Sequence, residues 1–400
     1  FQVLLDGGAY NAMGPTATFL CGTFGNMAYR LPAYRYFGRH VYTNKPPASA
    51  MRGFGAPQAY FAMESQFSMA AEEMGFDPID LRIINAMEEG DVIPEVATVS
   101  TCGFKESLEK VRELSGWDEK RKNRQPGHGL GISAYSFISG GVFNWFNTKY
   151  NFSAAEVRVY DDGTAHLFSM ACDIGQGPDT VLRQILAADL GLSIDKVRLT
   201  AMDTAQTPKA DLGSWGSRVT LMNGNAILEA TKKIKEMLIP VLFAEFDLNQ
   251  IQDLAFEDDH IFVKSNPKKR MSFAQAVYKA LRGRRGEPLV AQGYYTPRNK
   301  GLVSPAFSFG AQVAEVTVDQ DTGLVKVDKI YTAHDCGVPI NKKAVEGQLE
   351  GAIQMGLGYT LSEQFVMKDG RTLNSTFLDY KVPTALDMPP SESVEVETYE

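Results

Sequence analysis

The stretch "AMRGFGAPQ" at 50–58 places one arginine and one large aromatic among glycines. A buried strand gains nothing from Gly53 and Gly55, because glycine adds backbone entropy and no packing. A plain surface turn gains nothing from Phe54. The combination with Arg52 therefore predicts that another group comes close to the backbone at this point.

A second glycine loop, "DIGQGPDT" at 173–180, follows an apolar strand pattern and precedes a helix pattern. Backbone N–H groups at the start of a helix suit an anion. The amide of Gln176 can both donate and accept hydrogen bonds, as oxo groups and heterocycles require. A tight turn with an exposed glutamine explains the short stretch equally well.

The third stretch, "DLGSWGSRVTLMNGNA" at 211–226, alternates glycines with small hydroxyl residues and an arginine. Gly216, Ser217 and Arg218 together form a pattern that suits anion recognition. A Gly/Ser-rich loop that only caps the following helix is an equal alternative.

Other titratable residues give weaker signals. His334, Asp335 and Cys336 are adjacent on a strand pattern, so their side chains alternate between faces and favour a structural role. Glu64, Glu346 and Glu350 fall in helix patterns, where solvated or capping roles are expected. The glycine loops without a metal-ligand cluster suit a large anionic cofactor that brings its own reactive centre.

The elements that position these loops have recognisable patterns. Residues 34–43 predict a strand and 58–87 two helices divided at Gly75 and Asp77-Pro78, followed by a helix over 104–117. Strand, turn, strand, glycine loop and helix then occur twice, over 154–191 and 310–364, which suggests an internal pseudo-repeat in an α+β domain. The charged, then Pro/Gly-containing stretch at 118–129 is the best candidate for a domain boundary.

Composition excludes several protein classes. The chain has 400 residues, a formal net charge of −8 and 44% hydrophobic residues, which is typical of a soluble globular protein of two or three domains. No long basic run predicts a nucleic-acid partner. No apolar run approaches the ~18 residues of a membrane span. The four widely spaced cysteines favour reduced thiols and a cytoplasmic location, and argue against an iron–sulfur or structural zinc site in this chain.

In order along the chain, "AMRGFGAPQ", "DIGQGPDT", "GSWGSRVT", "VEGQLEGAIQMGLG" and "LDYKVPTALDMP" resemble the molybdopterin-binding large subunit of the xanthine dehydrogenase / aldehyde oxidase family. "TNKPPASAMRGFGAPQ", "SRVTLMNGNA" and Met355 look more like its 4-hydroxybenzoyl-CoA reductase branch. The resemblance implies an α+β fold of two molybdopterin-binding domains. Residues 1–120 would be the C-terminal portion of the first domain, 121–130 a linker, and 131–400 a second domain truncated at its C-terminal end.

The resemblance also implies site roles. Arg52 and Gly53 would face the cofactor, with Gln176, Gly216, Ser217 and Arg218 contacting it, and Phe54 would bracket a planar substrate. The cofactor would be molybdenum-molybdopterin, as the cytosine dinucleotide in bacterial members. Iron–sulfur and FAD subunits are expected as partners, in a dimer of heterotrimers.

Two family motifs are missing from the sequence. A Gly-Gly-Phe-Gly-Gly stretch belongs upstream, and the catalytic glutamate belongs in a Gly-Glu motif downstream. We therefore expect a fragment, with no catalytic base among these residues. The implied function is that of an oxidoreductase acting on an aromatic, heterocyclic or aromatic-CoA substrate. The alternative is a non-catalytic molybdopterin-binding scaffold or half of a split large subunit.

Overall fold

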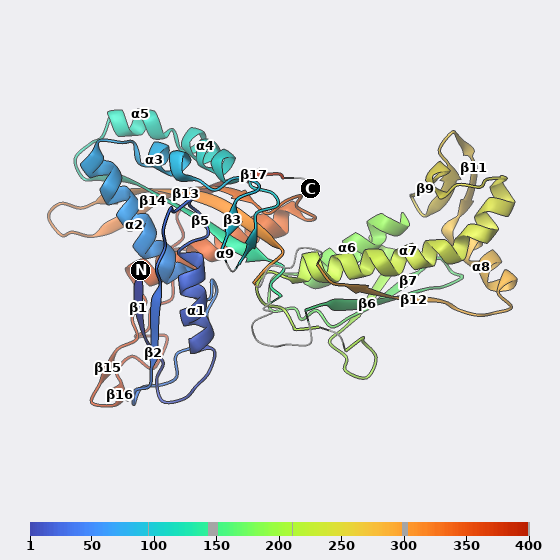
Figure 1. The fold of residues 1–400 in the computed structure, drawn as a ribbon, viewed down its shortest axis with the longest axis horizontal. Helices are drawn as coiled ribbons and strands as arrows, with labels where there is room; N and C mark the ends of the chain where they lie inside the picture. The colour runs from blue at the N-terminus through green and yellow to red at the C-terminus, as the bar shows by residue number, and fades with distance from the viewer. Residues whose placement is uncertain (95, 143–150, 210, 298–302, 399–400) are drawn as a thin grey trace. The chain divides into compact units, whose positions relative to one another are not determined.

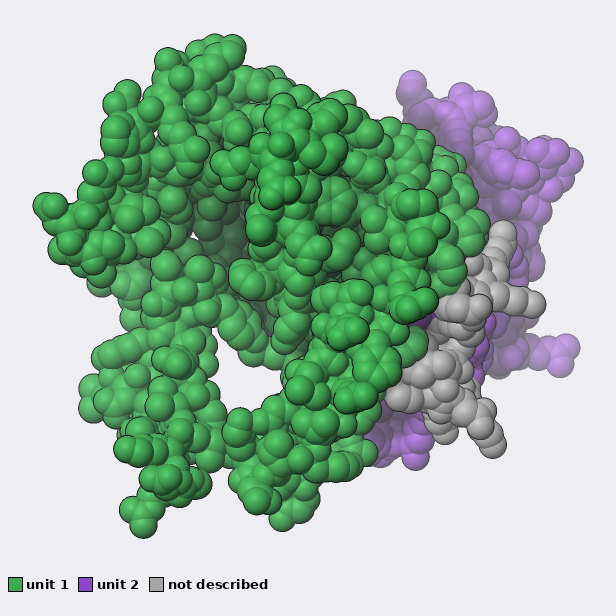
Figure 2. Space-filling view, turned by 60° about the vertical axis from the view of Figure 1, so that its left-hand side comes forward, with its two compact units in different colours: residues 1–137, 306–400 green, residues 138–305 purple. Residues whose placement is uncertain are grey.

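The computed structural model describes residues 1–94, 96–142, 151–209, 211–297 and 303–398 (Figure 1). They form two compact units, unit 1 from residues 1–137 and 306–400 and unit 2 from residues 138–305 (Figure 2). Each unit mixes helices with sheets, as the α+β prediction required. Among the described residues, no helix has the length and apolarity needed to cross a bilayer.

Unit 1 is organised around a four-stranded sheet of order β17-β14-β13-β5. Its β13 and β14 pair antiparallel and carry α4 packed on them. A two-stranded parallel sheet joins β1 to β2. The elements are β1 (Gln2–Asp6), α1 (Gly14–Phe24), β2 (Phe37–Val41), α2 (Ala56–Met74), α3 (Pro78–Asn85), β3 (Val92–Ile93), β4 (Ala97–Thr98), α4 (Phe104–Ser115), α5 (Trp117–Lys122), β5 (His128–Ser139), β13 (Ala306–Val318), β14 (Val325–Asp335), α9 (Lys342–Leu361), β15 (Met367–Lys368), β16 (Arg371–Thr372) and β17 (Ser391–Val396).

Unit 2 has a four-stranded sheet of order β12-β6-β7-β8, with the long helix α7 packed on β12 and β6. Apolar side chains of α6, α7 and α8 share one buried core with this sheet. The elements are β6 (Ser153–Val159), β7 (Ala165–Ser169), α6 (Pro178–Leu190), β8 (Val197–Ala201), α7 (Val219–Phe246), β9 (Leu254–Glu257), β10 (His260–Val263), β11 (Asn266–Ser272), α8 (Phe273–Gly283) and β12 (Leu289–Tyr295).

Local signals predicted the helix boundaries well. Gly75 ends α2 in the left-handed conformation, and the Asp77 side chain caps the start of α3 by accepting from the backbone N–H groups of Ile79 and Asp80. The helix expected over 104–117 instead divides at Gly116, which also adopts the left-handed conformation, so α5 begins at Trp117.

The stretch proposed as a linker, 121–130, lies inside unit 1. Its first residues belong to α5, and β5 begins at His128. The backbone N–H of Val318 in β13 donates to the carbonyl of Gly127 at 2.7 Å. The chain passes between the compact units at 137/138 and 305/306 instead, since β13, β14 and β17 pair in one sheet with β5. Both repeats expected over 154–191 and 310–364 are present. The strands of the first belong to the four-stranded sheet of unit 2, and those of the second to the four-stranded sheet of unit 1.

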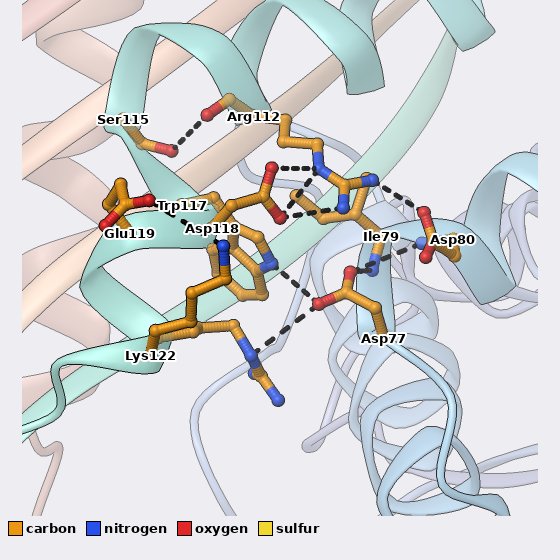
Figure 3. Close-up of polar contacts among 10 residues, drawn as sticks. Asp77, Ile79, Asp80, Arg112, Ser115, Trp117, Asp118, Glu119 and Lys122 are labelled. Atoms are coloured by element: carbon orange, nitrogen blue, oxygen red, sulfur yellow. Dashed lines mark hydrogen bonds and ion pairs between the residues drawn. The ribbon is translucent and has the colours of Figure 1, made fainter.

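A polar cluster fastens α3, α4 and α5 together (Figure 3). The Arg112 guanidinium donates to both carboxylate oxygens of Asp118, at distances from 2.7 to 3.1 Å, and to Asp80 Oδ1 at 2.6 Å. The indole N–H of the buried Trp117 donates to Asp77 Oδ2 at 2.9 Å. Since these groups come from three elements, the cluster fixes how the helices pack.

The cluster predicts a small acid dependence of stability. Hydrogen bonding to Arg112 holds the pKa of Asp118 below its usual range. Because the folded-state pKa is lowered, the stabilisation is complete above the unfolded-state value of about 3.9 and is lost as pH falls through the folded-state value. In Asp118→Asn we expect a weaker decline of melting temperature between about pH 4 and 2. Glu346→Gln on the exposed face of α9 is the control. An unchanged decline in Asp118→Asn would contradict this.

Candidate functional site

The loop at 51–55 has an unusual backbone. Gly53, Phe54 and Gly55 all have positive φ, of 92°, 50° and 98°. A large residue such as phenylalanine rarely adopts this conformation, which costs on the order of 1–3 kcal/mol and persists only when the surroundings impose it. The loop is therefore strained and must be held from outside.

Part of the reason for the glycines lies inside unit 1. A Cβ on Gly55 would stand 2.5 Å from the carbonyl oxygen of Ala17 in α1, and one on Gly53 would stand 2.7 Å from the Pro57 ring. These close contacts, with the positive φ values, explain glycine at both positions without any ligand. The glycines alone do not indicate a bound group.

Arg52 is held by α9. Its Nη2 donates to the backbone carbonyl of Gln348 at 2.8 Å and to Gln348 Oε1 at 3.1 Å. Desolvation by the neighbouring protein lowers the pKa of this guanidinium, and Tyr135 partly offsets the effect. Because guanidinium has five N–H donors and Arg52 is exposed, the side chain can still donate to an oxo or anionic group. Sequence reasoning missed Gln348, although it lies in the quoted "VEGQLEGA".

A small cavity of about 80 Å³ adjoins this loop. Arg52, Phe54 and Gln58 line it together with Cys21 of α1 and Tyr359 of α9. Desolvation raises the pKa of the Cys21 thiol to about 11, so this group is protonated at neutral pH. Polar and apolar atoms contribute about equally to the cavity surface, and Arg52 is the cation that lines it.

Gln176 organises its own loop. Its Nε2 donates to the carbonyl of Cys172 at 2.9 Å, and its Oε1 accepts from the N–H of Ile174 at 2.7 Å. Asp173 accepts from the N–H of Gly175 at 2.8 Å, and Asp179 adds a second carboxylate in the first turn of α6. Desolvation raises the pKa of Asp179, and Asp173 raises it further. Two carboxylates beside this helix start disfavour a phosphate there and favour a neutral hydrogen-bonding group.

Arg218 is fully buried and paired inside unit 2. It forms an ion pair with Asp211, which also accepts from the Asn223 amide at 3.0 Å, and its Nε donates to the Gly141 carbonyl at 3.0 Å. Burial lowers the pKa of the guanidinium, and Asp211 opposes that shift. The structure thus gives Arg218 a role within the protein, and its predicted cofactor contact stays a prediction.

Gly216 and Ser217 act through their backbones. Both have positive φ, and their carbonyls accept from the N–H groups of Gly141 and Gly140, each at 3.0 Å. Ser214, one of the small hydroxyl residues of the same predicted stretch, joins this segment to the Gln176 loop. Its Oγ donates to the Cys172 carbonyl at 2.6 Å and accepts from the Cys172 N–H at 2.9 Å. Unit 2 therefore brings the second and third glycine stretches together, whereas Arg52, Gly53 and Phe54 belong to unit 1.

The weaker candidates have structural roles. Asp335 is buried and accepts from the N–H groups of Gly103 and Gly337 and from Thr398 Oγ1. The neighbouring His334 Nδ1 lies 3.2 Å from the Tyr135 hydroxyl, and burial lowers the pKa of this imidazole. The expectation that Glu64 is solvated or caps a helix is wrong. It is buried and ion-paired with Arg82 at 2.8 Å.

The donor set fits a large cofactor that carries its own metal. Among the described residues, and apart from the chain neighbours, no heavy atom lies within 4 Å of the place where a Cβ would stand on Gly175, Gly177 or Gly213. The described backbone there leaves room for a bulky group. Within the described part of the chain, no three His, Cys, Asp or Glu side chains are grouped as metal ligands.

Comparison with protein families identifies the chain. Two models described as molybdopterin cofactor-binding domains match residues 1–86 and 110–389. The chain belongs to this molybdopterin-binding family. Its relatives are large subunits of the xanthine dehydrogenase and aldehyde oxidase type.

Known relatives align with this chain over nearly its whole length. A putative xanthine dehydrogenase molybdenum-binding subunit of Escherichia coli is 33% identical, over 100% of this chain and 53% of its own length. The large subunit of nicotine 6-hydroxylase from Paenarthrobacter nicotinovorans is 29% identical over 99% of this chain and 50% of its own. The crystal structure of quinoline 2-oxidoreductase from Pseudomonas putida superposes with a TM-score of 0.88 at 27% identity, covering 99% of this chain and 52% of that one. The chain thus spans about half the length of these relatives.

Proposed function

We propose that this chain is part of the large subunit of a molybdenum hydroxylase and binds molybdenum-molybdopterin in the cytosine dinucleotide form. The observation that carries the proposal is the joining of two glycine loops through Ser214, with open backbone at Gly175 and Gly213, in a molybdopterin-binding family member. When bound, such a cofactor supplies the redox centre.

The residues of the chain have distinct tasks in this proposal. Arg52, fixed by Gln348, donates hydrogen bonds to an oxygen of the bound group. The loops at Gln176 and at Gly216–Arg218 offer backbone and amide groups, and the carboxylates of Asp173 and Asp179 direct the phosphates elsewhere. Phe54, which lines the cavity, offers a ring to a planar aromatic or heterocyclic substrate.

Partners and substrate follow from the same proposal. Electrons would pass to iron–sulfur and FAD subunits, in a cytoplasmic dimer of heterotrimers. An aromatic-CoA substrate, as in the 4-hydroxybenzoyl-CoA reductase branch, is a second candidate that rests on "TNKPPASAMRGFGAPQ", "SRVTLMNGNA" and Met355.

Elemental analysis of the native full-length enzyme tests the proposal. We expect stoichiometric molybdenum, and a cytosine nucleotide after acid hydrolysis of the cofactor. A full-length protein without molybdenum would refute the proposal. A protein that holds molybdenum but has no oxidoreductase partner would support the scaffold alternative.

Phe54→Ala in the full-length enzyme tests the substrate role. Losing the ring should lower kcat/KM for the aromatic substrate by about 2- to 10-fold, since a stacked aromatic pair contributes about 0.5–1.5 kcal/mol. Molybdenum content should not change. Phe54→Tyr, which keeps the ring, is the control. A parallel loss of molybdenum and activity would count against a stacking role.

A further inference from the structure

The strained loop at 51–55 needs support, and α9 supplies it at two points. Arg52 Nη2 donates to the carbonyl and side chain of Gln348, at 2.8 and 3.1 Å. The hydroxyl of Tyr359 donates to Met51 Sδ at 2.8 Å. Two adjacent loop residues are thus bonded to two distant positions of one helix.

Helix geometry shows what these two contacts do together. Gln348 and Tyr359 are three turns apart in α9, about 16 Å along its axis, and differ by only about 20° in direction. They therefore lie on one face of the helix. Arg52 and Met51, which are adjacent in the loop, therefore contact two well-separated positions on one face of α9.

The middle of α9 carries a glycine, Gly351, close to the Arg52 side chain. A Cβ on Gly351, between the two contact points, would lie 3.4 Å from Arg52 Nη1, in ordinary van der Waals contact. Tyr359 lines the 80 Å³ cavity that Phe54 also lines. On its other side the loop packs on α1 through Gly55, so the loop lies between two helices.

We propose that Gln348 and Tyr359 are positioning residues that hold the 51–55 loop on α9 and so fix the direction of the Phe54 ring. The functional meaning of that direction rests on the proposed substrate role of Phe54. The contacts of Gln348 with Arg52 and of Tyr359 with Met51 lie within unit 1, and their effect on the loop is measurable without a cofactor. Two contacts at separate positions of α9 restrain the loop against sliding along the helix more strongly than either one alone.

The rate of trypsin cleavage after Arg52 reports how readily the 51–55 loop is released from α9. The protease can cut there only when the Arg52 side chain is free and the loop is open. The test uses the full-length enzyme and follows the peptide by mass spectrometry. In the double variant Gln348→Ala/Tyr359→Ala we expect cleavage there to rise by about 10-fold or more, with a smaller rise in each single variant. Cleavage after the exposed Lys122 in α5 should stay constant.

Matched variants separate positioning from general destabilisation. Gly347→Ala changes an exposed α9 residue, and among the described residues no atom beyond the chain neighbours and the nearby helix backbone lies within 4 Å of the new Cβ. This variant should leave cleavage after Arg52 unchanged. Gln348→Glu keeps an acceptor for Arg52, so cleavage after Arg52 should stay as slow in this variant as in the wild type. If Tyr359→Ala fails to fold, Tyr359→Phe keeps the ring and removes only the hydroxyl contact with Met51.

A spectroscopic probe reports on the Phe54 ring. With 4-fluorophenylalanine at position 54, the wild-type enzyme should give one narrow ¹⁹F resonance, and the double variant a shifted or broadened one. Unchanged cleavage and an unchanged resonance in the double variant would overturn the positioning role. Absence of molybdenum from the wild type would instead refute the proposed function and leave this inference standing.

Discussion

Replacing Glu64 with alanine is expected to destabilise unit 1 by about 3–5 kcal/mol, because it leaves a buried guanidinium without its carboxylate. Arg82 is fully buried and donates to Glu64 Oε2 at 2.8 Å. The same carboxylate accepts from the Tyr29 hydroxyl at 2.5 Å and from the Ala134 N–H at 2.6 Å. One substitution thus removes the common partner of groups from the α1–β2 connection, from α3 and from β5.

Unfolding of the purified protein in denaturant, with hydrogen exchange resolved to α2 and α3, measures the effect. Exchange in α7 of unit 2 is the internal reference. The double variant Glu64→Leu/Arg82→Leu is the matched control, since removing both charges avoids an unpaired ion and should cost less than Glu64→Ala. A loss below about 1 kcal/mol in Glu64→Ala would show that Arg82 finds other compensation.

The corresponding change in unit 2 is Asp211→Ala. It removes the ion-pair partner of Arg218, which is fully buried, and the acceptor of the Asn223 amide. We expect a loss of about 3–5 kcal/mol by the same reasoning. Because Asp211 Oδ1 also accepts from the Gly213 N–H at 2.9 Å, the segment at 213–218 should loosen as well.

Hydrogen exchange at 213–218 and at the Gln176 loop measures this loosening. Ser214 bonds to Cys172, so faster exchange should reach both stretches. Asp195→Ala, at an exposed position before β8, is the control and should leave both stretches unchanged. Rapid exchange at 213–218 with normal exchange in the Gln176 loop would show that Ser214 does not couple them.

Several features were predictable because their causes are local. Gly75, Asp77 and Pro78 end one helix and begin the next through the backbone conformations and the cap that those residue types favour. The glycine loop at 173–180 precedes α6 as the sequence pattern indicated. The ordered motifs indicated the molybdopterin-binding family, which the family match confirms.

Burial and distant pairing were not predictable. Glu64 and Arg218 have the residue types of solvated or ligand-binding groups, and only the packing around them shows that each is buried in an ion pair. The partner of Arg52 is 296 residues away, and Ser214 reaches a loop 42 residues earlier. The stretch at 121–130 has the composition of a linker, yet it pairs with β13 inside unit 1.

The sequence by itself determined the helices and turns, the glycine loops and the family, because short-range backbone preferences and motif order are written in adjacent residues. Only the tertiary structure decided which arginine is exposed at a loop and which is buried in an ion pair. It also showed that Gly53 and Gly55 are needed for strained backbone and close packing on α1. Those outcomes depend on desolvation and contact between segments far apart in the chain, which no local pattern encodes.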